Sequence, residues 1–533
     1  MSDIGDVLVS RSDIARLAGV RRPAVTNWER RHPDFPVPVV PPAGSGEPEV
    51  FRAAQILDWL SGRTIPSNAL QPGEPAGTTY GDRFRAGLGG APAGRLRAAV
   101  ERLAWRDAER VRGQLRMSDY LRLLLELVHV QSCQDERWSR YVEDPRIALR
   151  ELGVPEHGEQ PLSDVIRFLD NNPPASPDES RATFDRLLEL FCAVDGRGSE
   201  EFFTPRSVSR VMGRALAAQG LAKRLHDPFC RTGELLSAYL DAVGAHHGEP
   251  PPSVSGRSPR EDFLGLARMN TELHGAKRPS FLLGRLSPAQ YGDQGDLPGA
   301  CDVVITNPPF GSGGAWRDAP PVYWRYGTSR SLEFDWLQYV VSRLAPDGRA
   351  AVLMPSGAGS RGGAEQKLRA DLIEAGVVEC VMALPAQLFE LTTIQTHIWF
   401  LRPPREGPGE VLFVDGTNLG SMATRTRRVL SDEEIDGLVG AYASWRAAEK
   451  HGTGYADGPG LTRVVAAAEI AVRDHRLEPT LYVRDDLPAP GALDAPDIAR
   501  DLLAKLSARL RELQEEARAA DGRAERSLRR YGL

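Results

Sequence analysis

The first sixty residues carry apolar side chains at the spacing of two short consecutive helices. One side of these helices would be buried and would hold Ile14, Leu17, Val20, Val25 and Trp28. Gly19 stands where the helices would meet, Ser12 suits the cap of the first helix, and Pro23 suits the first turn of the second. The pattern predicts a helix-turn-helix.

The second of these helices would expose polar side chains that suit contacts with DNA phosphates or with base edges in a major groove. These residues are Arg22, Thr26, Asn27 and Arg30. Residues 35–38 and Val50-Phe51 would pair as a small β wing, ahead of a helix around residues 56–60. Residues 1–65 therefore resemble the winged helix-turn-helix of the MerR and excisionase group. The alternative is a helical hairpin whose arginines only face solvent.

The next two segments differ in composition. Residues 66–92 are rich in Gly, Pro, Ser and Thr, which predicts a flexible linker. Residues 93–195 alternate apolar and charged positions at helical period, which predicts a helical domain. Apolar positions of this kind include Leu121, Leu124, Leu125 and Val128.

Between residues 196 and 425, short apolar runs alternate with helical stretches. The expected strands are Val303–Ile305, Ala350–Met354, Val377–Met382, His397–Leu401 and Val411–Val414. Runs of this kind are typical of a doubly wound parallel sheet, so the sequence predicts an α/β, Rossmann-like domain. A helical or irregular extension would cover residues 426–490. Leucines at helical spacing predict an amphipathic helix over 491–533, which docks either on a partner or within the chain.

Composition narrows the classes of protein to consider. With 533 residues, 41% hydrophobic and 26% charged, the chain is a globular protein of several domains. The net charge of -6 excludes a global positive field, so any contact with DNA needs a local patch. The five cysteines are widely spaced and indicate neither a zinc site nor a disulfide framework. The N-terminus lacks the features of a secretory signal, and no apolar run approaches the ~20 residues that span a bilayer, so we expect a cytoplasmic protein.

The sharpest chemical signal is the tetrapeptide Asn307-Pro308-Pro309-Phe310, which directly follows an expected strand. In open parallel sheets, ligands bind outside the carboxyl ends of the strands. An aromatic amine is a poor nucleophile, and acceptors aimed at its hydrogens favour a more reactive nitrogen. The Asn307 side chain and the Pro308 carbonyl would be those acceptors, the prolines would hold the backbone rigid, and Phe310 would stack on an extruded base. This chemistry requires no residue that abstracts a proton.

This tetrapeptide is the amino-methyltransferase signature, and its surroundings resemble the modification (M) subunits of type I restriction-modification systems. Those subunits belong to the N-6 DNA methylases, which methylate adenine N6 in DNA. The resemblance also covers Arg361–Glu365 and Leu384–Phe389. It implies S-adenosyl-L-methionine (SAM) as cofactor, double-stranded DNA as substrate, a separate specificity subunit as partner, and no metal. It assigns catalysis to residues 307–310. It assigns cofactor binding to Phe203, Thr204, Pro205, Asp227, Cys230, Thr232, Gly233 and Ser258.

Three positions depart from the family pattern. Arg231 replaces a glycine in the cofactor loop, Ser258 stands where an acidic residue would bind the ribose, and Arg285 stands where an Asp would contact the adenine amine. Two hypotheses stay open on these residues. The chain is either an active adenine-specific DNA methyltransferase or a catalytically decayed, methyltransferase-like DNA-binding regulator or subunit. No phosphate-binding loop of the ATPase type is present, so DNA cleavage would need another subunit.

Overall fold

The computed structural model describes most of the chain in nine stretches. They are residues 8–39, 49–66, 116–152, 159–199, 203–244, 250–285, 299–311, 325–389 and 394–484, apart from single positions within them, with a few isolated residues in between. The predicted helix over 491–533 lies outside the described residues, as does most of the predicted linker. The chain divides into two compact units, Met1–Gly198 and Ser199–Leu533.

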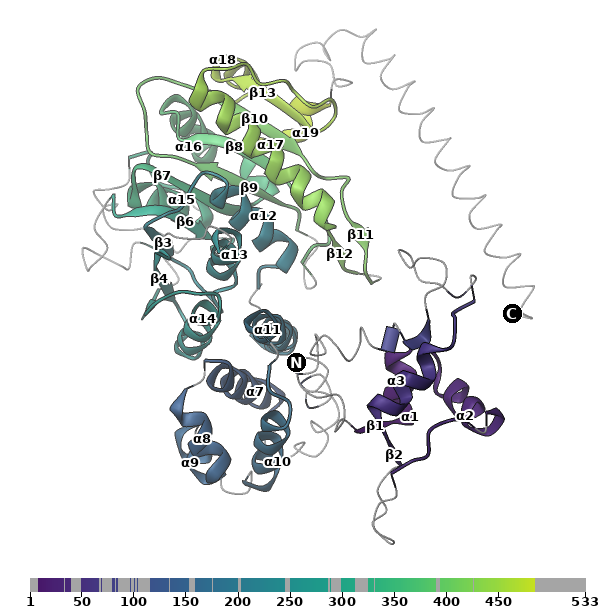
Figure 1. Ribbon diagram of the computed structural model, residues 1–533. Coiled ribbons are helices and arrows are strands. Elements are labelled where there is room, and N and C mark those ends of the chain that lie inside the picture. Colours follow the sequence, from purple (N-terminus) through teal and green to yellow (C-terminus); the bar gives the residue numbers. More distant parts are fainter. Residues whose placement is uncertain are drawn as a thin grey trace, which may run out of the picture. The chain divides into compact units, whose positions relative to one another are not determined.

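Within the described residues 8–61, the first unit contains three helices and a two-stranded sheet (Figure 1). These elements are β1 (Leu8–Ser10), α1 (Arg11–Leu17), α2 (Arg22–Arg31), β2 (Val50–Arg52) and α3 (Ala53–Ser61). Gly19 connects α1 to α2 with a φ of 68°, a conformation that suits glycine. Ile14 and Val25 are fully buried in a small core, and Trp28 packs against its side. Two short helices joined at Gly19 are thus present, and their assignment as a helix-turn-helix stays a prediction.

Two details of this region differ from the prediction. Ser12 lies inside α1, and the cap is Ser10, whose hydroxyl accepts from the Asp13 backbone N–H while the Asp13 carboxylate accepts from the Ser10 backbone. The extended conformation of Ser10 just before the helix is the one that a capping residue adopts.

The wing also differs. β2 pairs antiparallel with β1, and residues 35–38 form no strand; an isolated bridge joins Val39 to Val50. Pro36 and Pro38 lack the backbone N–H that a ladder needs.

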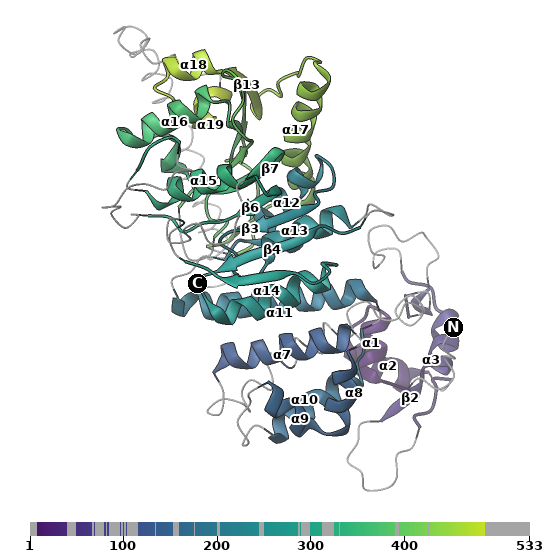
Figure 2. The same ribbon diagram turned by 90° about the vertical axis from the view of Figure 1, so that its left-hand side faces the viewer.

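The second part of the first unit is helical. It contains α7 (Met117–Ser132), α8 (Glu136–Glu143), α9 (Pro145–Glu151), α10 (Glu159–Asp170) and α11 (Pro177–Ser199), of which α8, α9 and α10 pack together (Figure 2). The apolar positions that predicted helices here are buried: Leu121, Leu124, Leu125 and Val128. Gln131 at the end of α7 donates a hydrogen bond of 2.7 Å to the carbonyl of Leu169.

The second unit is built on a nine-stranded sheet in the order β13-β10-β8-β9-β7-β6-β3-β4-β5. The strands are β3 (Arg224–Asp227), β4 (Ser253–Ser258), β5 (Ser280–Leu283), β6 (Cys301–Thr306), β7 (Leu344–Pro355), β8 (Val378–Ala383), β9 (Thr396–Leu401), β10 (Glu410–Asp415) and β13 (Thr462–Ala466). All five strands expected from the sequence are present. Two short strands, β11 (Ser421–Met422) and β12 (Arg428–Val429), pair separately.

The sheet is mixed, whereas the sequence pattern predicted a parallel one. β9 runs antiparallel between β7 and β8, and β13 runs antiparallel at the edge beside β10. The connection from β8 to β9 contains a turn and, at its described positions, no helix. A parallel crossover normally needs such a helix, so the chain returns in the opposite direction. Periodicity alone does not report strand direction.

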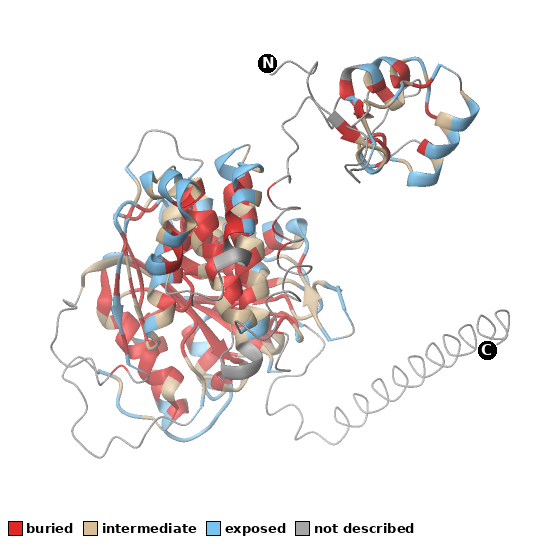
Figure 3. Cartoon of the chain, turned by 90° about the horizontal axis from the view of Figure 1, so that it is seen from below, coloured by how far each residue is buried: buried red, intermediate tan, exposed pale blue. Residues whose placement is uncertain are grey.

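Helices cover both faces of this sheet (Figure 1). One face carries α12 (Arg206–Ala217), α13 (Glu234–Val243), α14 (Glu261–Leu273) and α17 (Asp432–His451). The other carries α15 (Leu332–Arg343), α16 (Ala364–Glu374), α18 (Ala467–Val472), α19 (Pro479–Val483) and the short 3-10 helix Ser356–Gly359. Alternate residues of β6 enter the two cores, Val303 and Ile305 on one side and Val304 on the other. The strands are accordingly buried, and exposed residues gather on the outer sides of the helices (Figure 3).

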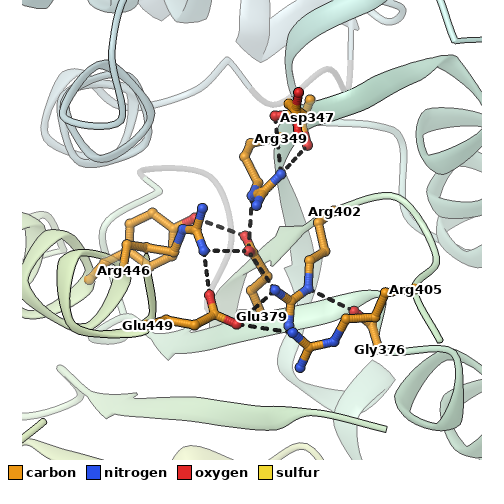
Figure 4. A network of polar contacts seen from close by, with 10 residues as sticks. Asp347, Arg349, Gly376, Glu379, Arg402, Arg405, Arg446 and Glu449 are labelled. Carbon is orange, nitrogen blue, oxygen red and sulfur yellow. Dashed lines mark hydrogen bonds and ion pairs between the residues drawn. The ribbon is translucent and has the colours of Figure 1, made fainter. Parts of the chain in front are cut away.

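A buried charge cluster ties α17 to the sheet (Figure 4). Glu379, near the start of β8, is fully buried and accepts from Arg349 at 2.9 Å and from the Tyr442 hydroxyl at 3.1 Å. The guanidinium groups of Arg402 and Arg446 lie 3.6 and 3.3 Å from the same carboxylate. This cluster lies toward the amino ends of the parallel strands, at the edge of the sheet opposite to the carboxyl ends.

Candidate active site

The tetrapeptide lies at the carboxyl end of β6, where the sheet order places it beside the end of β3, with β4 the next strand beyond. Asn307 and Pro308 are buried, and Pro309 and Phe310 are half-buried. Phe310 packs against the core on the α12 and α13 side. The fold therefore gives the aromatic ring and the preceding carbonyls a fixed position at the ligand-binding edge of the sheet.

The residue after the tetrapeptide is fixed by a buried acid. Gly311 has a φ of 119°, and its N–H donates to Glu333 over 3.1 Å. Glu333, in the first turn of α15, is fully buried and also accepts from Arg361 over 2.7 Å. The Arg361 guanidinium additionally contacts Ser331 and Glu365. Arg361 and Glu365 are the ends of a segment that resembles the family, so this segment supports the tetrapeptide through Glu333.

Thr204 contacts the tetrapeptide directly. The side-chain N–H of Asn307 donates to the Thr204 hydroxyl over 3.1 Å. The Thr204 backbone N–H lies 3.3 Å from Glu234, which also accepts from the Thr232 hydroxyl at 2.9 Å. Glu234 lies in the first turn of α13. Glu234 thus joins the Thr204 segment to the start of α13, and Asn307 is linked to them through the Thr204 hydroxyl.

The last residue of β3 and the loop that leads to α13 hold four of the expected cofactor residues. Asp227 is buried and accepts from the backbone N–H of Phe229 over 3.0 Å. Burial, with a smaller contribution from the nearby Glu234 charge, raises the pKa of Asp227 to about 7. Gly233 has a φ of 78°, and a Cβ there would lie 3.1 Å from the Ala267 carbonyl. A side chain at position 233 would therefore strain the loop.

Further contacts hold this loop against β4 and α14. The backbone N–H of Cys230 donates to the Arg257 carbonyl over 2.7 Å, and burial raises the pKa of the Cys230 thiol. Ser258, at the end of β4, is fully buried and accepts from the backbone N–H of Arg260 at 3.3 Å.

The segment before α12 completes the set of expected cofactor residues. The Phe203 ring packs edge-on against Phe263 of α14 with centroids 5.6 Å apart, and Pro205 precedes the first residue of α12. The segment that leads into α12 thus contacts α14 through Phe203, and α13 and Asn307 through Thr204.

Arg231 takes an unexpected position within this arrangement. Its side chain is buried, with 5% of the residue exposed, and it donates to the backbone carbonyl of Asn307 over 2.8 Å. Its guanidinium carbon lies 5.0 Å from the centre of the Phe229 ring. The sequence indicated a departure at Arg231 but gave no sign of this contact with Asn307. Glu234 and Glu333 were likewise not predicted as site residues from the sequence, because a single Glu in a helix has no distinctive pattern.

The other expected site residues lie elsewhere. Arg285 follows the edge strand β5 and is exposed, so it does not accompany Arg231 into the interior. The four polar residues of α2, Arg22, Thr26, Asn27 and Arg30, are all exposed, as a DNA-contacting surface requires. Their contact with DNA stays a prediction. Among the described residues, no three His, Cys, Asp or Glu side chains group as metal ligands would. None of the described helices has the length and apolar character needed to cross a bilayer.

Known proteins resemble more than half of this chain. At 28% identity, the methylase subunit of the type I restriction enzyme HindI from Haemophilus influenzae aligns over 56% of this chain and 67% of its own length. The MjaIX methylase subunit from Methanocaldococcus jannaschii is 26% identical over 56% of this chain and 54% of its own length. The matched part of the chain thus spans about half to two thirds of the length of these curated relatives.

Solved structures share the fold. The type I restriction-modification methyltransferase subunit from Streptococcus thermophilus superposes with a TM-score of 0.52 at 19% identity, covering 73% of this chain and 99% of that subunit. A chain from a structural study of type I restriction-modification assembly has a TM-score of 0.54 at 20% identity, covering 79% of this chain and 99% of its own.

The family model for N-6 DNA Methylase matches residues 178–487, which is more than half of the 533 residues. This match confirms the family resemblance inferred from the tetrapeptide and its surroundings. It does not extend to the N-terminal helices, so the MerR-like resemblance stays a prediction. The chain belongs to the N-6 DNA methylase family.

Proposed function

We propose that this chain transfers a methyl group from SAM to the N6 amine of adenine in DNA, as the modification subunit of a restriction-modification or related defence system. The observation that carries this proposal is the intact Asn307–Phe310 tetrapeptide at the carboxyl end of β6, with Asn307 held by Thr204. Family membership supports both the cofactor and the substrate.

The residues present fit SAM. Gly233 lacks the Cβ that would strain the loop before α13, and Asp227, Ser258 and Thr204 supply buried polar groups around it. Phe203, Pro205, Cys230 and Thr232 would complete the binding set. When bound, SAM supplies an electrophilic methyl group on a sulfonium. Ser258 makes a weaker contact than the acidic residue usual in the family, so we expect affinity to depend more on the other groups.

The chain's own chemistry is placement and electrostatics. The Asn307 side-chain oxygen and the Pro308 carbonyl would accept the hydrogens of the adenine amine and stabilise the positive charge that develops on its nitrogen. Phe310 would stack on the base after it leaves the duplex. Arg231 and Glu333 fix the backbone on either side of this segment through Asn307 and Gly311.

Recognition of the DNA sequence would come from a separate specificity subunit. The relatives are named as subunits of restriction enzymes, which supports assembly with further chains. We assign residues 491–533 to docking on that partner. Arg22, Thr26, Asn27 and Arg30 of α2 would add contacts with DNA.

The second candidate is a decayed methyltransferase-like protein that regulates or assembles without catalysis. The observation that favours it is Arg231, a bulky buried cation in a loop where the family has glycine. A guanidinium that blocks the cofactor would leave the fold intact and abolish transfer.

Calorimetric titration with SAM and incorporation of tritiated methyl groups into DNA separate the two candidates. The full chain, together with its specificity partner, should bind SAM saturably and label DNA. Asn307→Ala should retain SAM binding and lose label at least about a hundredfold, by analogy with the loss of one preorganised electrostatic group. Asp347→Asn, an exposed change at the opposite edge of the sheet, is the matched control. If calorimetry detects no binding of SAM and no tritiated methyl group enters DNA, the second candidate, a methyltransferase-like protein without catalysis, would be the function.

A further inference from the structure

Arg231 is a buried cation without a paired carboxylate among the described residues. Its Nη1 donates to the Asn307 carbonyl, and its Nε is buried with no hydrogen-bond partner in the described part of the chain. The Phe229 ring is a further close neighbour of the guanidinium. Neither a backbone carbonyl nor an aromatic ring carries a full negative charge.

Such an arrangement is costly in the free chain. Arginine stays charged in proteins, and a buried charge is normally paired or hydrogen-bonded. The nearby Asp227 supplies less than a full compensating charge near neutral pH, because burial raises its pKa to about 7. The carboxylate of Glu234 also lies nearby, but it accepts from the Thr204 backbone and from Thr232, and among the described contacts it makes no ion pair with Arg231. The site around Arg231 therefore favours an incoming anionic group that pairs with the guanidinium directly.

Its neighbours identify the ligand that would bring that group. Arg231 lies in the loop between Asp227 and Gly233 and contacts Asn307, and Asn307 in turn contacts Thr204. These are the residues proposed above to hold SAM, whose carboxylate is its anionic group. A planar guanidinium suits a carboxylate, to which it can donate two parallel hydrogen bonds.

We propose that Arg231 is the counter-ion for the carboxylate at the methionine end of SAM. The inference rests on the proposed function and deepens it. Arg231, in place of the glycine usual in the family, would then favour cofactor binding: its side chain adds a charge contact that selects ligands with a carboxylate. The pairing of Arg231 with the carboxylate also offsets the repulsion between the buried guanidinium and the sulfonium, because the carboxylate neutralises the charge of the arginine.

The test compares two ligands and several variants of the full chain by calorimetry. Decarboxylated SAM keeps the adenosine and the sulfonium and lacks the carboxylate. The wild-type chain should bind SAM roughly ten- to a hundredfold more tightly than the decarboxylated ligand, the range expected for a charge-assisted hydrogen bond. Arg231→Met should lose most of this preference, and Arg231→Lys should keep part of it. Arg150→Met, an exposed change on α9, should leave it intact.

Each contrary result has a distinct meaning. Equal wild-type affinity for the two ligands, together with normal methyl transfer, overturns the role of Arg231 and leaves the proposed function standing. Tighter binding of SAM by Arg231→Met than by the wild type would show that the Arg231 side chain blocks the cofactor site, and it overturns the inference. A wild-type chain that binds neither ligand and labels no DNA overturns both. The comparison of the two ligands on the wild-type chain needs no variant, so the test remains valid even if a variant fails to fold.

Discussion

The side-chain nitrogen of Asn307 donates a hydrogen bond of 3.1 Å to the hydroxyl of Thr204, although 103 positions separate the two residues. Because the amide nitrogen faces Thr204, the amide oxygen is turned away from that hydroxyl. The contact thus sets which end of the amide would meet an incoming amine. Thr204 is buried, so solvent does not compete strongly for the bond.

Thr204→Val should lower kcat for methyl transfer by roughly tenfold, the effect of about 1.4 kcal/mol in the transition state. The substitution keeps the shape of the side chain and removes the acceptor that orients Asn307. Thr204→Ser retains a hydroxyl and should recover most of the rate. The measurement is kcat alongside the Kd for SAM. If Thr204→Val weakens SAM binding and leaves kcat unchanged, Thr204 acts on the cofactor and does not position Asn307.

Glu333 should prove essential for holding the other end of the tetrapeptide. It is fully buried and accepts from both Gly311 and Arg361. Glu333→Ala leaves the N–H of Gly311 and the guanidinium of Arg361 without this acceptor. We expect a tenfold or greater loss of kcat, with SAM affinity changed less than threefold, as calorimetry and a methyl-transfer assay would measure. Equal losses in kcat and in SAM affinity would point instead to a general collapse of the site.

Much of this architecture follows from the sequence. Runs such as Val303–Ile305 predicted strands because their burial on both faces demands unbroken apolar character. β3 and β4 were harder to predict, since Arg224–Asp227 and Ser253–Ser258 mix polar residues into short strands. The antiparallel direction of β9 depends on how the connecting segment folds, and local patterns do not encode it.

The candidate site was predictable as a set of segments, but its internal contacts were not. The residues after β3 and β6 meet because parallel strands end at one edge of a sheet. The contact between Arg231 and Asn307 depends on the rotamer of one long side chain, which is fixed only by the packed surroundings. The role of Glu333 likewise depends on the register of α15 against Gly311.

Asp227 should make the second unit less stable as the pH rises. Its pKa is about 7 in the folded chain against 3.8 ordinarily, so the fold binds this proton more tightly than the unfolded chain does. The contribution is fully present below pH 3.8 and is lost as the pH rises through about 7, by roughly 4 kcal/mol in total. Asp227→Asn should remove this contribution, so the fall in thermal stability between about pH 6.5 and pH 8 should disappear. An unchanged slope would mean that the carboxyl is solvated in the folded chain.

His397 should act in the opposite direction. Burial lowers its pKa from 6.5 to about 4, so the folded chain holds it neutral while the unfolded chain protonates it. Its contribution is present above pH 6.5 and is lost as the pH falls through about 4, by roughly 3 kcal/mol. In His397→Gln, stability should fall with rising pH between 4 and 6.5 more steeply than in the wild type, because only the opposite contribution of Asp227 remains. In Asp227→Asn, where His397 still titrates, stability should instead rise more steeply with pH between 4 and 6.5 than in the wild type.

Glu379 should contribute more to stability than any partly exposed member of its charge cluster (Figure 4). Its side chain is fully buried, and Arg349, Arg402 and Arg446 all lie within 3.6 Å of its carboxylate. Glu379→Gln leaves these guanidinium groups without their shared anion, so the free energy of unfolding should fall by about 3–5 kcal/mol.

Arg405 offers the matched control for Glu379. Its side chain is 36% exposed and pairs with Glu449 at 3.1 Å, so Arg405→Met should lower the free energy of unfolding by less than about 1 kcal/mol. Urea unfolding followed by tryptophan fluorescence measures both variants. Because the cluster lies toward the amino ends of the strands, Glu379→Gln should leave the Kd for SAM unchanged under conditions where the chain remains folded. A larger loss in Arg405→Met than in Glu379→Gln would show that Glu449, and not Glu379, is the principal counter-ion of the cluster.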